Sequence, residues 1–396
     1  MKSLYLKIIQ KISNLKRKVC RFIDPSDFYL PDIIAKPKNS ILRGVNVGHV
    51  CAFTYGNAGD ALLPVAIRDF FMEEWHDIKN WTGMDVHRLV TPTQIRYFNR
   101  KDFLIIGGGG LFLRDTCPNE ISGWQWNCSI EAMQRIKVPI IAFAIGYNRF
   151  RSQEDFKPIF IKHLNAFVEK CAFVGIRNHG SIESLKPYLL TDALREKLVY
   201  QPCLTTLIAQ IYPSFVDYEK KEDFVAFNCA FDRQVMRGVN DIHLYSIART
   251  ALELSRYTNI KYYSHMDSDK KALTYFDELG VEYELVELHD VGEIIKQYSL
   301  PRLVIGMRGH AQMIPFGCQT PILSIISHDK MQWFLDDIHH SDWGVDVLSS
   351  GFGDELSEKA LDMYKNFKDN IKEIQKSQME LWNITLGNMK QIKSAI

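Results

Sequence analysis

The amino-acid sequence predicts an α/β fold in which two Rossmann-like domains face each other across a cleft. Apolar runs of strand length alternate with segments of helical periodicity through most of the chain, as they do in βαβ units that build a parallel sheet. A chain of 396 residues is longer than one ordinary core, so two domains are expected. Apolar content falls and charge rises over residues 212–223, and we place the domain boundary there.

The expected elements follow from this alternation. Strands are expected in the first half at residues 45–53, 103–106, 139–144, 173–176 and 198–200, and in the second half at residues 224–230, 260–264, 281–286, 303–306 and 322–326. Helices are expected after Asp60, across residues 121–136 and 155–169, and after Gly180. The domain plan comprises a basic amphipathic helix at residues 1–23, an N-terminal Rossmann-like domain at 40–215, a C-terminal one at 222–350, and a helical extension at 354–396.

Composition excludes several classes of function. The chain has 48 Lys and Arg residues against 47 Asp and Glu residues, so no overall positive field attracts nucleic acid. Its eight cysteines include no C-x-x-C pair, and no cluster of His and carboxylate ligands is apparent, so we expect neither a metal site nor a disulfide framework. No segment is long and apolar enough to cross a bilayer. We therefore expect a cytoplasmic protein that binds any anionic ligand through local charges.

The N-terminal segment, residues 1–23, has an unusual distribution of charge. It contains seven Lys or Arg residues and no Asp or Glu, and its apolar side chains fall on one helical stripe. This pattern is typical of a helix that lies on an anionic membrane surface, where each basic residue contributes roughly 1 kcal/mol. A basic helix docked on the protein itself would have the same pattern, and both interpretations stay open.

The sequence YGNAGDAL comes after the first long strand and leads into a helix. Gly56 and Gly59 allow a tight or left-handed backbone on either side of Asn57, and Asp60 stands where an N-cap residue belongs. Free N–H groups and the helix dipole would then point at a bound ligand. A capped strand-to-helix turn without a ligand is the alternative.

A run of four glycines, in LIIGGGGLF, follows the next strand. Such a run is costly in conformational entropy unless the backbone closely approaches a ligand or a crossing element, which makes Gly108 and Gly109 candidates for the cleft lining. The run does not match G-x-G-x-x-G, and no acidic residue follows at the end of a second strand about 20 residues on, so a nicotinamide cofactor is not expected.

Two later strand ends carry arginine. FVGIRNHGS presents Arg177 and Asn178 before a helix, and VIGMRGHAQMIPFG presents Arg308 and His310 before another helix. Arginine binds carboxylate or phosphate groups bidentately, so these side chains suit an anion held in the cleft. A surface salt bridge for Arg177 and a structural hydrogen bond for His310 are the alternatives.

Taken in order, GNAGD, GGGG, GIRNHGS and MRGHA resemble the motifs of the polysaccharide pyruvyltransferase family over residues 48–330. The resemblance implies a glycosyltransferase-like fold of the B type. It also implies transfer of a pyruvyl group from phosphoenolpyruvate to two hydroxyls of a sugar, which gives a cyclic ketal and inorganic phosphate. Two positions depart from the family pattern: Gly309 stands where leucine is frequent, and Gln201-Pro202 stands where Asp-Pro is frequent.

Carried over position by position, the resemblance implies that Arg308, Arg177 and Asn178 bind the donor. His310 would be the general acid that protonates the methylene carbon, since an unperturbed imidazole has a pKa near ~6.5. The glycine-containing turns would line the acceptor side of the cleft through Gly56, Asn57, Gly59, Asp60, Gly108 and Gly109. Phosphoenolpyruvate is then a co-substrate, and no other cofactor and no metal is required.

The acceptor follows from where such sugars are made. Acceptor sugars of bacterial surface polymers are commonly assembled on a lipid carrier, so we expect a sugar or lipid-linked oligosaccharide, with galactose as a first candidate hexose. Residues 1–23 would then hold the enzyme at the inner face of the cytoplasmic membrane. Trp124 and Trp126 either stack on a sugar ring or belong to the core. A nucleotide-sugar-dependent glycosyltransferase and a non-catalytic sugar-binding protein of the same fold stay open as other functions.

Overall fold

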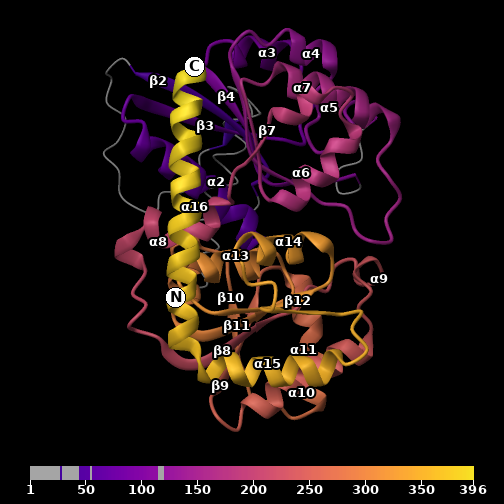
Figure 1. The fold of residues 1–396 in the computed structure, drawn as a ribbon, viewed down its shortest axis with the longest axis vertical. Helices are drawn as coiled ribbons and strands as arrows, with labels where there is room; N and C mark the ends of the chain where they lie inside the picture. Colours follow the sequence, from indigo (N-terminus) through magenta and orange to yellow (C-terminus); the bar gives the residue numbers. More distant parts are fainter. Residues whose placement is uncertain (1–26, 29–43, 54–55, 115–119) are drawn as a thin grey trace, which may run out of the picture.

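The computed structural model describes residues 27–28, 44–53, 56–114 and 120–396. These residues form two α/β halves stacked along the long axis of the molecule (Figure 1). The predicted basic helix at residues 1–23 lies outside the described residues, and so does the apolar stripe on which its membrane interpretation depends.

The first half is built on a sheet of strand order β1-β3-β2-β4-β5-β6-β7, in which the short β1 is antiparallel to β3 and every other described pair is parallel. Its strands are β1 (Asp27–Phe28), β2 (Val45–Cys51), β3 (Ile78–Asp85), β4 (Phe103–Phe112), β5 (Ile140–Tyr147), β6 (Phe173–Ile176) and β7 (Leu198–Tyr200). Its helices are α2 (Ala58–Glu74), α3 (Pro92–Phe98), α4 (Ile130–Gln134), α5 (Pro158–Lys170), α6 (His179–Leu185), α7 (Asp192–Glu196) and α8 (Ile208–Ile211).

The second half is built on a parallel sheet of order β10-β9-β8-β11-β12-β13. Its strands are β8 (Glu222–Asn228), β9 (Asn259–Ser264), β10 (Glu284–Glu287), β11 (Pro301–Gly306), β12 (Ile322–Ile326) and β13 (Gly344–Asp346). Its helices are α9 (Gln234–Arg237), α10 (Asp241–Leu254), α11 (Leu273–Glu278), α12 (Val291–Ser299), α13 (His310–Gly317), α14 (Asp329–Asp337), α15 (Phe352–Lys365) and α16 (Phe367–Ala395). Short 3-10 turns lie at Lys186–Tyr188, Leu204–Leu207, Pro213–Phe215 and Asp267–Ala272.

The alternation of apolar runs located the parallel strands well. Every strand expected from the sequence is present, and β6, β7 and β12 have the expected bounds. The sequence analysis missed β1, β3 and β13. The sequence of β3, IKNWTGMD, is rich in polar residues because half of its side chains are only partly buried, and β13 is too short to show a period.

The helix expected at residues 121–136 is wrong. Only α4 is helical there, because Gly123 adopts a φ of +77° and the Ser129 side chain caps a new helix by accepting from the Ala132 N–H. Trp124 and Trp126 are buried in the core of the first half, and the Trp124 indole N–H donates to His163 Nδ1 at 2.9 Å. These two rings are therefore core residues, and neither presents a face to a sugar.

One hydrophobic core runs across the seam between the halves. It joins Leu62 and Phe70 of α2 to Ile314 and Phe316 of α13 and continues into the second sheet. The backbones are also close, since a Cβ added at Gly317 would stand 2.0 Å from the Thr205 carbonyl oxygen. The two halves therefore present the walls of the space between them in a fixed relation.

Helix α16 lies along both halves and ties them together (Figure 1). Gln378 on this helix is buried, and its amide donates to the carbonyl oxygens of Thr206 at 3.1 Å, Phe316 at 2.8 Å and Gly317 at 3.1 Å. Leaving three buried carbonyl groups without a donor would be costly, so this one side chain fixes the helix to both halves.

The departure from the family pattern at Gln201 also serves this helix. Gln201 is buried, its Oε1 accepts from Asn388 Nδ2 at 3.0 Å, and its Nε2 donates to the Pro202 carbonyl oxygen at 3.0 Å. The bond with Asn388 attaches the end of β7 to α16, and Gln201 is not among the residues that line the cleft described next.

Candidate active site

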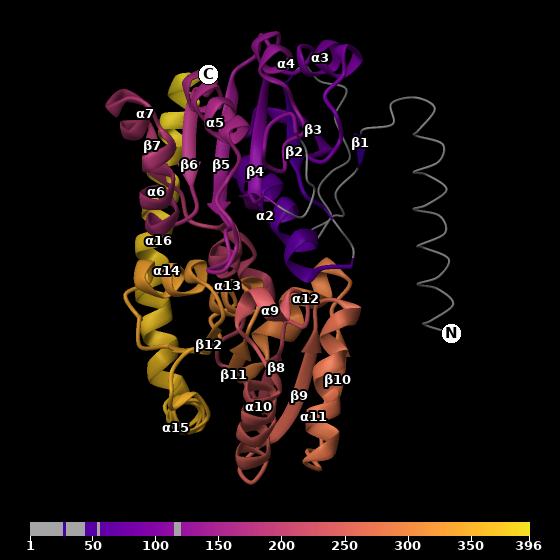
Figure 2. The ribbon, with the colours of Figure 1, turned by 90° about the vertical axis from the view of Figure 1, so that its right-hand side faces the viewer.

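A cleft of about 440 Å³ lies between the carboxyl ends of the two sheets. Open α/β sheets bind ligands at this edge. Figure 2 shows α2 and α13 at the waist between the first sheet above and the second sheet below. The charged side chains of the lining are Arg177, Arg233, Arg237, Arg308, Lys330, Asp60 and Asp232. Five cations thus meet two carboxylates, which favours an anionic ligand.

A larger hollow of about 770 Å³ lies at the opposite edge of the second sheet, beside β8, β9 and β10. Its lining includes Glu222, Glu282 and Glu284 but none of the motifs singled out in the sequence. The cleft between the sheets is therefore the candidate site.

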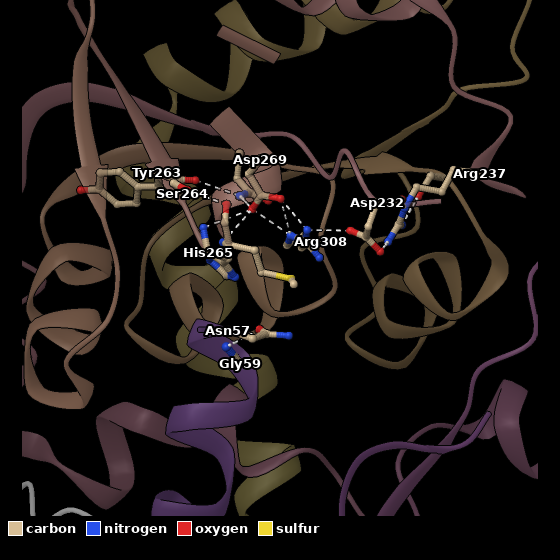
Figure 3. Close-up of polar contacts among 12 residues, drawn as sticks. Asn57, Gly59, Asp232, Arg237, Tyr263, Ser264, His265, Asp269 and Arg308 are labelled. Atoms are coloured by element: carbon tan, nitrogen blue, oxygen red, sulfur yellow. Dashed lines mark hydrogen bonds and ion pairs between the residues drawn. The ribbon is translucent and has the colours of Figure 1, made fainter. Parts of the chain in front are cut away.

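Arg308 is fixed by carboxylates of its own half (Figure 3). Its Nε donates to Asp269 Oδ2 at 2.9 Å, its Nη2 pairs with Asp269, and the same Nη2 stands 2.6 Å from Asp232 Oδ1. The side chain is 10% exposed, and these bonds raise the pKa of Arg308 further above its usual range despite burial. Arg308 lines the cleft as predicted, but Asp269 and Asp232 already compensate its charge.

Arg177 differs, because it forms no ion pair within the part of the chain that the structure describes. It is 4% exposed, and its Nε and Nη2 have no hydrogen-bond partner among those residues. The guanidinium lies against Gly146, where a Cβ would stand 2.4 Å from Nη2. Burial lowers the pKa of Arg177, an effect that Cys203 and Asp60 partly oppose. A buried, unpaired guanidinium is a site for an anion.

Asn178 is not among the residues that line the cleft, and its contact with the donor stays a prediction. It is the N-cap of α6, and its Oδ1 accepts from the Ser181 N–H at 2.8 Å. A capping asparagine directly before a helix is the expected structural use of this residue type, and Asn178 therefore serves the turn that positions Arg177.

Lys330 is a second unpaired cation, and the sequence analysis missed it. It follows β12 in the first turn of α14, and among the described residues no hydrogen bond or ion pair reaches its Nζ. Burial, with Arg177 and Arg237 nearby, lowers the pKa of Lys330 well below its ordinary value. Open α/β sheets bind ligands at the carboxyl ends of their strands, and this rule selected Arg308. Applied to the segment SHDK after Ile326, the same rule would have selected Lys330.

His310 begins α13 and lies against the first turn of α2. A Cβ added at Gly59 would stand 2.0 Å from His310 Nδ1, so only glycine allows the ring to occupy this position. Its Nε2 is buried without a hydrogen-bond partner in the described residues. Burial, and then Arg177, Lys330 and His265, lower the pKa of His310 well below its ordinary value. This direction favours the neutral form of the imidazole, so a role as proton acceptor stands beside the general-acid role expected from the sequence.

The GNAGD turn is capped by Asn57 and not, as predicted, by Asp60. Asn57 Oδ1 accepts from the Gly59 N–H at 3.1 Å, and Asn57 Nδ2 donates to Asp60 Oδ2 at 2.9 Å. Asn57 and Asp60 both line the cleft, whereas Gly56 is exposed outside it. Burial raises the pKa of Asp60, although Lys330, Arg308 and Arg177 oppose the shift.

The four glycines serve both purposes weighed from the sequence. A Cβ at Gly107 would stand 2.0 Å from the Phe143 carbonyl oxygen, and Gly108 and Gly109 have φ values of +82° and +97°, which favour glycine. Gly109 and Gly110 line the cleft, whereas Gly108 faces Ile67 on α2 and does not. Close packing against β5 and α2 accounts for the first two glycines, and the last two line the cleft.

Gly309 leaves open space at the cleft wall. Its φ of −54° and ψ of −42° are ordinary helical values, and the nearest atom to an added Cβ is Lys330 Cε at 3.6 Å. The backbone does not need glycine here, so the departure from leucine enlarges the space beside Lys330 without changing how Arg308 and His310 are held. No group of three or more His, Cys, Asp or Glu side chains in the described ranges could hold a metal ion.

The contact between Gly59 and His310 gives a test of the seam. Gly59→Ala should lower the free energy of unfolding by about 1–3 kcal/mol, because the new methyl overpacks His310. Gly387→Ala, on α16 with no atom within 4 Å of the added Cβ, should raise it by about 0.5–1 kcal/mol through helix propensity. Urea-induced unfolding of both variants measures this, and equal shifts of the same sign would contradict the contact.

Comparison with known proteins adds to this geometry. A model of the family described as polysaccharide pyruvyl transferase matches residues 57–329. No curated protein sequence matches the chain. Among solved structures, a glycosyltransferase from Rickettsia africae ESF-5 is 12% identical with a TM-score of 0.53, over 89% of this chain and 98% of that one. HepE from Anabaena, solved with UDP and glucose, is 10% identical with a TM-score of 0.53, over 88% of this chain and 98% of that one.

A putative UDP-N-acetylglucosamine 2-epimerase from Listeria monocytogenes is 12% identical with a TM-score of 0.51, over 84% of this chain and 91% of that one. At such identities the likeness shows the fold alone, which is the glycosyltransferase B-type arrangement of two Rossmann-like domains. The family match covers most of the chain and takes in the turns that hold Asn57, Arg177, Arg308 and His310. The chain therefore belongs to the polysaccharide pyruvyl transferase family.

Proposed function

We propose that this transferase moves the pyruvyl group of phosphoenolpyruvate onto two hydroxyls of a hexose in a bacterial surface-polysaccharide precursor, releasing inorganic phosphate. The observation that carries the proposal is the pair of unpaired cationic side chains, the buried Arg177 and the half-buried Lys330, in one cleft with His310. Phosphoenolpyruvate has a carboxylate and a phosphate, so each cation can bind one charged group. No further cofactor is needed for this reaction.

The donor contacts differ from those expected from the sequence. Arg308 keeps its carboxylate partners, so its part is to hold the Met307–His310 turn in place and to contribute positive potential. Arg177 and Lys330 bind the donor directly. The buried Arg177 guanidinium has no carboxylate partner in the described part of the chain, and burial and nearby arginines lower the pKa of Lys330. The negative charges of phosphoenolpyruvate would pair with Arg177 and favour the protonated form of Lys330.

Two proton transfers accompany ketal formation. A proton adds to the methylene carbon of phosphoenolpyruvate while a sugar hydroxyl oxygen bonds to the adjacent carbon and gives up its own proton. The oxygen of a second hydroxyl then bonds to the same carbon, and the bond between this carbon and the phosphate oxygen breaks. Phosphate leaves with the proton of the second hydroxyl. The neutral His310 takes the hydroxyl proton as general base. Two carboxyl groups of the described residues line the cleft, and because Asp232 is paired with Arg308 and Arg237, we assign the supply of the carbon-bound proton to Asp60, whose pKa is raised by burial.

The rival glycosyltransferase function lacks a matching feature in this cleft. A nucleotide base commonly stacks on an aromatic ring, and among the described lining residues Phe150 is the one Phe, Tyr or Trp side chain. The His328 ring stacks on Phe150, with 4.8 Å between the ring centroids. The guanidinium groups of Arg233 and Arg237 lie 5.3 Å from the same ring. Phe150 thus offers no open face on which a nucleotide base could stack. The non-catalytic alternative would bind a sugar but release no phosphate.

The roles of His310 and Lys330 are tested by phosphate release from phosphoenolpyruvate with a panel of hexosides and lipid-linked acceptors. His310→Asn should lower turnover by roughly 10²–10⁴-fold with little change in donor binding. Lys330→Met should raise the KM for phosphoenolpyruvate roughly 10- to 100-fold. Lys376→Met, at an exposed position of α16, is the matched control and should change neither value. Normal turnover by His310→Asn would contradict the base assignment.

Donor binding should also take up protons. Burial and neighbouring cations lower the pKa values of His310 and Lys330 in the free protein, and a bound anion raises both. Affinity for phosphoenolpyruvate should therefore fall as the pH rises through the pKa values of the complex. Isothermal titration calorimetry in buffers of different ionisation enthalpy measures the uptake. A binding enthalpy that does not depend on the buffer would show that these groups keep their protonation state.

The location of the reaction is part of the proposal. Within the described ranges no helix is long and apolar enough to span a membrane. We assign attachment at the inner face of the cytoplasmic membrane to the basic residues 1–23, which would bring the cleft to a lipid-linked acceptor. Deleting these residues should move the protein from the membrane fraction to the supernatant after cell lysis, and an unchanged distribution would count against this attachment.

A further inference from the structure

Two neutral amide side chains on the first-half wall of the cleft have hydrogen-bonding atoms with no partner in the described residues. Gln125 is 4% exposed and its Nε2 lacks an acceptor, while Asn148 is 8% exposed and its Oδ1 lacks a donor. Both residues line the cleft. Buried polar atoms are rarely left unpaired, so an unpaired donor and an unpaired acceptor in one wall point to a ligand that supplies both partners.

Gln125 is held in one orientation by a chain of contacts that starts at the end of β3. Asp85 Oδ1 lies 3.1 Å from His87 Nδ1 and also accepts from the His87 backbone N–H at 2.9 Å. His87 Nε2 then contacts Gln125 Oε1. The oxygen end of the Gln125 amide is therefore occupied, and its N–H groups are the end left for a ligand.

Asn148 is held by the adjoining strands. Its backbone N–H donates to the Phe112 carbonyl oxygen at 2.9 Å, directly after β5. Its side chain lies over Gly110, where an added Cβ would stand 3.0 Å from both Asn148 Cβ and Nδ2. The last glycine of the GGGG run therefore makes room for the Asn148 amide at the cleft wall.

This wall contrasts with the cationic part of the cleft. The unpaired groups there, Arg177 and Lys330, are positively charged, whereas Gln125 and Asn148 carry no charge and offer one donor and one acceptor. An anion could accept from the Gln125 N–H but would leave the Asn148 oxygen without a donor. A hydroxyl group both donates and accepts, so a polyhydroxylated neutral ligand matches this pair.

We propose that Gln125 and Asn148 form the acceptor subsite, in which the Gln125 N–H donates to one sugar hydroxyl and the Asn148 oxygen accepts from another. His87 and Asp85 are positioning residues that act through Gln125. The inference rests on the proposed function for the identity of the reaction, and it adds the residues that select the acceptor. Sites that hydrogen-bond a substrate hydroxyl discriminate strongly against analogues that lack it.

Steady-state phosphate release with each substrate varied in turn tests the subsite. Gln125→Glu keeps an acceptor for His87 but removes the N–H donor, so it should raise the acceptor KM roughly 10- to 100-fold and leave the phosphoenolpyruvate KM unchanged. Asn148→Ala should likewise raise the acceptor KM and leave the phosphoenolpyruvate KM unchanged. Gln134→Glu, at an exposed position of α4, is the matched control. A rise in both KM values, or in neither, would overturn the subsite.

The positioning role of His87 has its own readout. His87→Phe leaves Gln125 free to rotate, so it should raise the acceptor KM without raising the KM for phosphoenolpyruvate. Combined with Gln125→Glu it should add little further loss, because both changes remove the same donor. Fully additive losses would mean that His87 does not act through Gln125.

Direct binding separates failure of this inference from failure of the proposed function. Methyl glycosides of common hexoses are titrated into the wild type and Gln125→Glu by calorimetry, without phosphoenolpyruvate. Weaker binding to the variant supports the subsite, whether or not any sugar supports phosphate release. The absence of phosphate release with every sugar and lipid-linked acceptor would contradict the pyruvyl-transfer proposal but not the subsite. Equal binding to both proteins, or no binding to the wild type, overturns the subsite.

Discussion

The pairing of Arg308 with Asp269 is the interaction on which the second-half wall of the cleft depends. Besides the guanidinium, the buried Asp269 carboxylate accepts from the backbone N–H groups of His265 and Met266, at 3.1 and 3.3 Å. The loop after β9 and the turn after β11 are thus joined at one carboxylate. A buried ion pair of this kind is costly to break, because either partner alone would leave an uncompensated charge.

This pairing also decides which cations are left to bind a ligand. Asp269 and Asp232 compensate Arg308, and Asp232 additionally pairs with Arg237 at 3.4 Å. Arg177 and Lys330 have no such carboxylate within the described chain. The cleft therefore has a neutralised side, which holds the turns in place, and an uncompensated side, which suits a small dianion. The neutral amides Gln125 and Asn148 line the same cleft and belong to neither set of charged groups.

The two halves must keep a close relation for this site to exist. The shared core, the contact of His310 with Gly59, and the length of α16 across both halves all hold them together. At the edge of the seam, Arg151 also donates to Asp329 at 2.7 Å and to Asp346 at 2.9 Å. Its partners lie in the second half, so this residue adds an ionic link beside the cleft.

The sequence by itself determined the local elements and the edge at which the site lies. Apolar alternation located the strands, and the rule that ligands bind at carboxyl ends selected Arg177, Arg308 and His310. Only the tertiary structure decided that Asn178 is a cap, that Arg308 is already paired and that the Gln125 N–H is left without a partner in the cleft wall. The physical reason is that charge compensation and burial depend on segments far apart in the chain. Arg308 and Asp269, for example, are separated by 39 positions. The apolar alternation of a strand, in contrast, is a property of the strand's own residues.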